Sequence, residues 1–165
     1  MKYRYYLNIG TNLGDRHANL RRAIVALSAG TGGCMVSDII ESEPWGFASS
    51  NRFWNVGVAV DSTLEPHDLL DWLHDIEHRL GSASHRNADG SYTDRLVDID
   101  IMAIDDEQGN PVVIDTPTLQ VPHPHLNDRD FFLIPYHQLS KCGNIAMKPG
   151  VEGVSRECGH VAQDD

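Results

Sequence analysis

The spacing of apolar residues alternates between two periods along the chain, and the order of these segments restricts the possible folds. A period of two is typical of a strand with one buried face, whereas a period near 3.6 is typical of a helix. The segments with strand character are 3–9, 35–41, 53–60, 96–104 and 111–114. The segments with helix character are 16–29, 66–80 and 129–139. Turn residues such as Gly81 and Gly109 separate them.

This order predicts an α+β domain. The strand and helix segments follow one another as β-α-β-β-α-β, which is the order of a ferredoxin-like antiparallel sheet with helices on one face, here with C-terminal additions. The β-rich run 96–104 predicts a central strand of that sheet. We expect one domain over residues 1–140, followed by a poorly ordered tail at 141–165, where no sustained periodicity is found.

The charge of the chain limits its partners. The sequence holds 24 Asp and Glu against 13 Lys and Arg, a formal net charge of −11. Such a surface repels nucleic acid and anionic membranes unless basic residues gather in one place. No apolar run approaches the roughly 20 residues of a membrane span, and the three cysteines lie outside any C-x-x-C motif. Reduced thiols, a cytoplasmic location and a monomer are therefore expected, without nucleic-acid or membrane partners.

Two acids interrupt the apolar run 96–104. Asp98 and Asp100 alternate with Ile99 and Ile101, so the acids project from one face of the strand, about 7 Å apart, and the isoleucines from the other. Mg²⁺ prefers one or two carboxylates together with water and substrate phosphate, and this pair could offer them. An exposed sheet face with two solvated acids explains the pattern equally well.

Basic residues flank the acid pair in the sequence. Arg86 and Arg95 precede it and Arg129 follows, and guanidinium groups suit bidentate contacts with phosphate. His123 and His125 alternate with prolines and could bind zinc, although a hydrogen-bonding or phosphate-contacting role is favoured because no third soft ligand is near. Neither of the usual glycine-rich phosphate loops occurs.

Aromatic and amide side chains form a third group. Residues 43–47 read Glu-Pro-Trp-Gly-Phe, and strand alternation puts Phe53 and Asn55 on one face and Trp54 on the other. A stacking ring beside an amide could bind a flat heteroaromatic molecule, while ordinary core packing is the alternative.

Taken together, these segments resemble the 6-hydroxymethyl-7,8-dihydropterin pyrophosphokinase family of the folate pathway. The matching motifs are Ile9 to Asp15, Glu43-Pro44-Trp45-Gly46, Phe53-x-Asn55, Ile76-Glu77-x-x-Leu80-Gly81, Arg95 to Ile101, and Val121-Pro122-His123-Pro124 with Arg129-x-Phe131. They keep their order across residues 7–135. The chain departs from the family pattern at Ser82 and Ser84, where arginines are common, at Tyr92 and Asp94, where the family has Trp and Pro, and at His125.

The resemblance implies a transfer of pyrophosphate from MgATP to the pterin hydroxymethyl group, with AMP released. It implies that Asp98 and Asp100 bind two Mg²⁺ ions, and that Arg95 and Arg86 act at the transferred phosphates. The expected ATP-contacting residues are Glu77, Arg95, Ile101, His123 and Arg129. The expected pterin-binding residues are Ser42, Pro44, Trp45, Phe53, Asn55 and Phe131.

Two other functions remain open from the residues alone. A metal-dependent phosphohydrolase could use Asp98, Asp100 and His123, with water as the attacking group. A ferredoxin-like RNA-binding module would need exposed aromatic residues beside a basic sheet, and the two acids argue against it.

Overall fold

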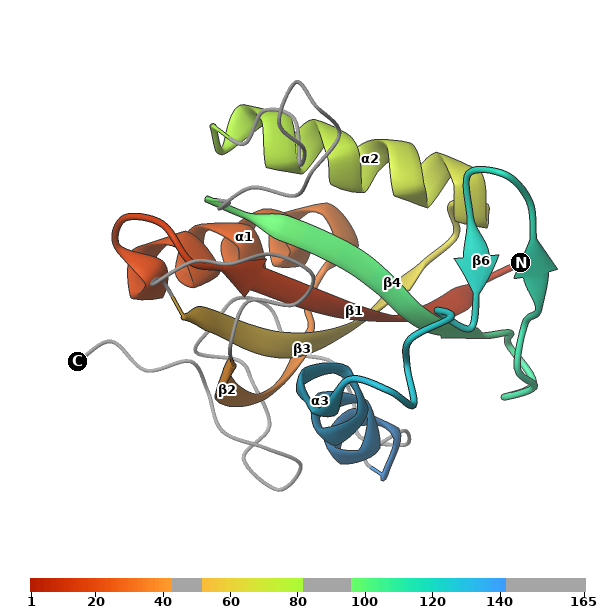
Figure 1. Ribbon diagram of the computed structural model, residues 1–165. Helices are drawn as coiled ribbons and strands as arrows, with labels where there is room; N and C mark the ends of the chain where they lie inside the picture. Colours follow the sequence, from red (N-terminus) through yellow and green to blue (C-terminus); the bar gives the residue numbers. More distant parts are fainter. Residues whose placement is uncertain (43–51, 82–95, 142–165) are drawn as a thin grey trace.

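The structure of the chain is a computed structural model that describes residues 1–42, 52–81 and 96–141 (Figure 1). The described elements are β1 Tyr3–Thr11, α1 Arg16–Thr31, β2 Met35–Ser42, β3 Phe53–Ser62, α2 Pro66–Arg79, β4 Asp98–Asp105, β5 Ile114–Asp115, β6 Gln120–Val121 and α3 Asp130–Lys141. The main strands and helices lie within a few residues of the segments predicted from the sequence. Of the tail predicted at 141–165, Lys141 is the last residue of α3, and 142–165 lies outside the described residues.

Four strands form one antiparallel sheet in the order β2-β3-β1-β4. β4 is therefore an edge strand, and the prediction of a central strand at 96–104 is wrong. Its apolar density has another cause, because both of its faces are covered by side chains of helices. The pair β5-β6 forms a separate small sheet next to β4 (Figure 1).

The sheet is covered by helices on both faces. α1 and α2 pack on one face, and α3 packs on the other, which we call the α3 face (Figure 1). The expectation of helices on one face thus holds for α1 and α2 only. Phe132 and Leu139 of α3 pack with Tyr6 and Met102 of the sheet. This apolar contact explains why the last helix docks on the second face.

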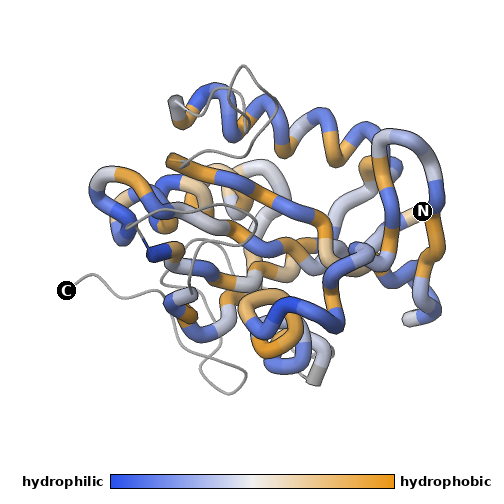
Figure 2. The backbone as a smooth tube through the Cα atoms, in the orientation of Figure 1, coloured by the Kyte–Doolittle hydropathy of each residue, from blue (hydrophilic) through white to orange (hydrophobic). Residues whose placement is uncertain are grey.

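β4 contains a bulge that preserves both of its faces. Tyr6 pairs with Ala103 and Leu7 with Ile101, so Met102 is an extra residue in β4. Met102 and Ala103 both pack in the cluster under α3. Asp98 and Asp100 come before the bulge, where strict alternation holds, and Figure 2 shows hydrophilic and hydrophobic residues alternating along this strand.

The first helix begins where the sequence predicts and ends slightly later. Asp15 caps it by accepting a hydrogen bond from the backbone N–H of Ala18 at 3.0 Å. The expected stop at Gly30 is instead at Gly32, whose φ of 83° is in the left-handed region. Gly30 serves packing, because a Cβ there would lie 2.3 Å from the Trp72 ring of α2.

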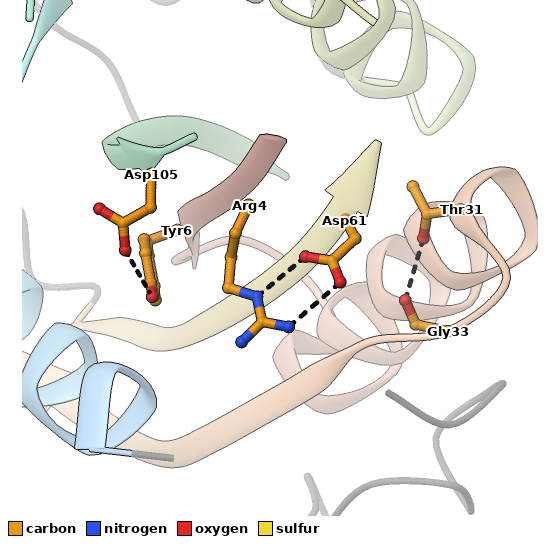
Figure 3. A network of polar contacts seen from close by, with 6 residues as sticks. All are labelled: Arg4, Tyr6, Thr31, Gly33, Asp61 and Asp105. Carbon is orange, nitrogen blue, oxygen red and sulfur yellow. Dashed lines mark hydrogen bonds and ion pairs between the residues drawn. The ribbon is translucent and has the colours of Figure 1, made fainter. Parts of the chain in front are cut away.

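Polar side chains interact at the end of the sheet where β1 begins and β4 ends (Figure 3). Arg4 forms a bidentate ion pair with Asp61, at 2.8 and 3.1 Å, and the Tyr6 hydroxyl donates to Asp105 at 3.1 Å. These residues line a cavity of about 450 Å³ far along β1 and β4 from Gly10 and Asp98. No described helix is long and apolar enough to cross a membrane.

Candidate functional site

A pocket of about 400 Å³ lies at the outer edge of β4, between α2 and the segment that leads to α3. Its lining residues come from three parts of the chain: Leu70, His74 and Glu77 of α2, Asp98 to Ile101 of β4, and Pro117 to Gln120 with His123 and Pro124. The edge position of β4 makes this pocket possible, because a further strand beside it would fill the space.

The acid pair forms one wall of this pocket. Asp98 and Asp100 are both half-buried and both line it. Ile99 and Ile101 are buried in the core beneath α1 and α2, as strand alternation predicts. Two carboxylate groups therefore reach the pocket from a rigid strand, so their spacing is set by the backbone.

Glu77 joins α2 to the acid pair. Its side chain is 4% exposed, and Oε2 accepts a hydrogen bond from the backbone N–H of Ile99 at 2.6 Å. Ile99 lies between the two acids, and its N–H is a backbone donor of an edge strand. Glu77 thus supplies the hydrogen-bond acceptor that a backbone carbonyl of a further strand would supply if β4 were not at the edge of the sheet.

His123 lies against the same strand. Its backbone N–H donates to the carbonyl of Met102 at 2.9 Å, and its Nδ1 accepts from the backbone N–H of His125 at 3.0 Å. The pKa of His123 is lowered to about 4, mainly by burial and then by the nearby Arg129 and His125, while Asp98 acts in the opposite direction. The ring is neutral at pH 7, with Nδ1 as acceptor and the proton on Nε2. His123 can therefore offer one N–H donor.

Arg129 directly precedes α3 and lies above two aromatic rings. The carbon of its guanidinium group is 5.0 Å from the ring centre of Phe132 and 5.7 Å from that of Phe131. Its effect on the pKa of His123 places its charge close to that ring. The stacking orients a cation near the acid pair.

The amide and aromatic group lies on the α3 face of β3, and β1 lies between β3 and β4. Asn55 is 2% exposed, and its Nδ2 donates to the Ser42 hydroxyl at 2.9 Å. A Cβ at Gly10 would lie 3.0 Å from Asn55 Oδ1 and 3.5 Å from the Phe53 ring, so these two side chains share this face. Trp54 points to the other face, where its Nε1 donates to Glu41 at 3.1 Å.

Gly10 connects the two groups. It pairs with Asn55 on β3 and with Asp98 on β4, so the three residues form one row across the sheet. Two strand spacings separate Asn55 from Asp98, about 10 Å. No side chain rises from Gly10 between them, and the side chains of Asn55 and Phe53 lie over this position instead.

Comparison with known proteins decides the family. Residues 6–141 match the family described as 7,8-dihydro-6-hydroxymethylpterin-pyrophosphokinase (HPPK). The chain belongs to the HPPK family. Curated relatives carry the name 2-amino-4-hydroxy-6-hydroxymethyldihydropteridine pyrophosphokinase. One from Porphyromonas gingivalis is 41% identical over 79% of this chain and 86% of its own length. Similar proteins from Aquifex aeolicus and Bacillus subtilis are 35% and 33% identical over 79% and 81% of this chain, and each match covers 76% of the relative.

Membership of the HPPK family confirms the function inferred from the motifs. The chain is an enzyme that transfers a pyrophosphoryl group to hydroxymethyldihydropterin in folate biosynthesis, with ATP as co-substrate. The comparisons give no support to the phosphohydrolase alternative.

The structure brings several of the residues expected for an HPPK site together. Glu77, Asp98, Asp100, Ile101 and His123 line one pocket. Ser42, Phe53 and Asn55 lie together on the neighbouring strands, outside the lining of that pocket. Four further expected residues, Pro44, Trp45, Arg86 and Arg95, lie outside the described part of the chain.

Some residues that line the pocket, and Asn8 of the neighbouring strand β1, could not be singled out as site residues from the motifs. Leu70 and His74 line the pocket, and the spacing of His74 and Glu77, three residues apart on one helix, could have indicated this. The segment 117–120 and Asn8 carried no recognisable signal.

The described residues offer carboxylates for a metal ion but no complete set of protein ligands. Among residues 1–42, 52–81 and 96–141, no three His, Cys, Asp or Glu side chains gather around one position. Asp98 and Asp100 are two carboxylates of this part of the chain that could contribute oxygen atoms to a metal site. Such an incomplete set suits Mg²⁺, which retains water and binds substrate phosphates.

Proposed function

We propose that this HPPK-family enzyme performs pyrophosphoryl transfer on the α3 face of the sheet, with ATP at the acid pair and the pterin at Asn55. One observation carries the proposal: Asn55, Gly10 and Asp98 form a single row across three strands. A flat ring beside Asn55 would extend its hydroxymethyl group over Gly10 toward phosphates held at Asp98.

The two acids fit the Mg²⁺ ions that ATP would carry. Asp98 and Asp100 are hard oxygen ligands on one face of one strand, half-buried at the pocket wall. Mg²⁺ at these carboxylates would neutralise phosphate charge and withdraw electron density from the phosphorus under attack. Two ions are proposed, since each acid can contribute to one.

The proposed ATP contacts surround the acid pair. Arg129 binds phosphate oxygens through its guanidinium group, and His123 donates to a phosphate oxygen from Nε2–H. Neutral His123 is suited to this, because its N–H can orient a phosphate oxygen without adding positive charge beside Mg²⁺ and Arg129. Ile101 contributes an apolar contact, and Glu77 holds β4 in place. Arg86 and Arg95 are proposed as further phosphate-binding side chains.

The proposed pterin slot is built around an amide. Asn55 is held by the Ser42 hydroxyl, which fixes its orientation toward a polar ring edge. Phe53 and Phe131 would stack on or border the ring, and Trp45 and Pro44 would complete the slot. These residue types match a flat heteroaromatic substrate with hydrogen-bonding edges.

The reaction requires little covalent chemistry from the protein. The hydroxymethyl oxygen of the pterin attacks the β-phosphorus of ATP, forming an O–P bond. The bond from that phosphorus to the oxygen bridging it to the α-phosphate breaks, and AMP leaves with this oxygen. The hydroxyl proton passes to solvent or to a carboxylate of the acid pair. Positioning and charge neutralisation supply the rate enhancement.

Finer features of the fold and setting are also proposed. The sheet order β2-β3-β1-β4 with two helices on one face supports a ferredoxin-like topology. Burial raises the pKa of the Cys34 thiol to about 11, which supports a reduced, unreactive thiol. A cytoplasmic location is proposed as well. We also propose a monomer with one domain over 1–140 and a separate tail, which light scattering and limited proteolysis can test.

A coupled assay of AMP release tests the proposed site. The parent enzyme should release AMP from MgATP only when 6-hydroxymethyl-7,8-dihydropterin is present. Asp98→Ala and Asp100→Ala should each lose at least 100-fold in kcat, because each removes a carboxylate at the transferring phosphates. Asp105→Asn is the matched control, since Asp105 lies on the same strand but contacts Tyr6 at the other end.

Three outcomes separate the alternatives. AMP release without the pterin would support the hydrolase and contradict the transferase. Parent-like turnover in either Ala variant would remove the acid pair from the site. Equal losses in Asp105→Asn would show that any acid lost from β4 impairs the enzyme.

A further inference from the structure

An asparagine in the middle of the sheet carries a role that none of the motifs assigns. Asn8 of β1 is 2% exposed on the α3 face, between Tyr6 and Gly10. It pairs with Gly57 on one side and with Asp100 on the other. A buried amide is costly unless it is hydrogen-bonded, so its partner should be informative.

The partner is a helix carbonyl that cannot be satisfied in the ordinary way. Asn8 Nδ2 donates to the carbonyl oxygen of Phe131 at 2.7 Å. In an α-helix that carbonyl accepts from the N–H four residues later, which here is Pro135, inside α3. Proline has no N–H, so a strand side chain supplies the donor that the helix lacks.

This bond fixes the first turn of α3 to the strand position beside Asp100. Phe131 is in that turn, and Arg129 directly precedes it with its guanidinium group over Phe131 and Phe132. The helix residues proposed to contact substrate are thus tied to β1 next to the proposed metal ligand. One side chain therefore sets the separation between the two halves of the site.

α3 has independent attachments further along. At Gly57 the sheet comes so close that an added Cβ would lie 2.6 Å from Pro135 Cβ. Gln138 forms two hydrogen bonds with Asp38, at 2.8 Å from Nε2 and at 3.0 Å to Oε1. These contacts keep the helix on the sheet when Asn8 is lost, so the Asn8 bond acts mainly on the first turn.

We propose that Asn8 is a positioning residue for pyrophosphoryl transfer, which holds Phe131 of α3 and the preceding Arg129 in register with Asp100. This inference rests on the site proposed above. Loss of the Asn8 bond would displace Phe131 and the first turn of α3, so we expect lower substrate affinity and turnover as well as lower stability.

The test combines Asn8→Ala with Pro135→Ala. The second substitution restores a helix N–H for the Phe131 carbonyl and keeps the Cβ that packs at Gly57. The double variant therefore satisfies the Phe131 carbonyl but lacks the hydrogen bond between Asn8 of β1 and α3. Kinetic constants for MgATP and the pterin are measured by AMP release, and melting temperatures by circular dichroism, on the full chain.

Asn8→Ala should lower kcat/KM for the pterin at least tenfold, and the double variant should keep this loss while regaining most of the melting temperature. Pro135→Ala alone should behave like the parent. Gln138→Ala is the matched control: it loses two hydrogen bonds of α3 and should melt earlier, with kcat/KM within about twofold of the parent.

A double variant with parental kcat/KM would overturn the proposal, because the role of Asn8 would then be only to satisfy a carbonyl. An unchanged kcat/KM in Asn8→Ala would overturn it as well. If Asn8→Ala does not fold, the double variant still decides. Failure of the proposed site is a different result, since it would appear as active Asp98→Ala or as AMP release by the parent without the pterin.

Discussion

The carboxylate of Glu77 on α2 accepts a hydrogen bond of 2.6 Å from the backbone N–H of Ile99, the residue between the two acids of β4. The interaction attaches α2 to the edge strand β4 at the residue between Asp98 and Asp100, so it affects how these two acids are aligned. The bond is buried, so the Ile99 N–H loses its acceptor when the carboxylate is removed.

Glu77→Ala should reduce the free energy of unfolding by about 2–3 kcal/mol, because a buried N–H loses a charged acceptor. Glu77→Gln retains an oxygen acceptor and should lose about half as much. Urea unfolding at pH 7.5 measures both, and AMP release reports the alignment of the acids. Equal stability of Glu77→Ala and the parent would show that the bond adds nothing to the folded state.

Gly10→Ala should impair the pterin side of the site more than the fold. The new Cβ would lie 3.0 Å from Asn55 Oδ1 and 3.5 Å from the Phe53 ring. We expect KM for the pterin to rise about tenfold and stability to fall by about 1 kcal/mol, from mild overpacking. KM for MgATP is the internal control. An equal rise in both KM values would indicate general disturbance of the sheet.

Strand periodicity was sufficient to predict how the two groups of site residues face. Alternation separates Asp98 and Asp100 from Ile99, and it separates Asn55 from Trp54, because successive side chains point to opposite faces. These are local consequences of backbone geometry, so they need no knowledge of the tertiary structure.

The sequence could not reveal which strands neighbour each other. β4 is as apolar as a central strand because helices cover both of its faces, so composition could not show that it is at the edge. The Asn8 bond to Phe131 joins residues 123 positions apart, and Pro135 explains it only once α3 is known to lie over β1. Such contacts depend on docking and have no local pattern.

Gly57→Ala should destabilise the protein through α3. The added Cβ would lie 2.6 Å from Pro135 Cβ, 3.0 Å from Leu139 Cδ1 and 3.2 Å from the Ser37 hydroxyl. Because the Pro135 ring cannot rotate away from a contact of 2.6 Å, the helix must move, and we expect a loss of about 2–3 kcal/mol. Thermal unfolding measures it. A change below about 0.5 kcal/mol, the size of an ordinary surface substitution, would contradict the close packing.

His123 should make stability depend on pH in the weakly acidic range. Burial, together with the nearby Arg129 and His125, lowers its pKa to about 4, whereas in the unfolded chain the value is near 6.5. Below pH 6.5 His123 takes up a proton in the unfolded state but stays neutral in the folded state. Its contribution to stability is therefore complete above pH 6.5 and is lost as pH falls through about 4.

The parent should therefore lose about 2 kcal/mol more than His123→Gln between pH 7.5 and pH 4.5, a value reduced for the partial exposure of the ring. Urea unfolding in EDTA, without Mg²⁺, isolates this effect from metal binding. Gln138→Ala is the control, because it removes non-titrating hydrogen bonds and should give a pH profile parallel to that of the parent. A His123→Gln profile parallel to that of the parent would mean that the ring protonates as readily in the folded state as in the unfolded chain.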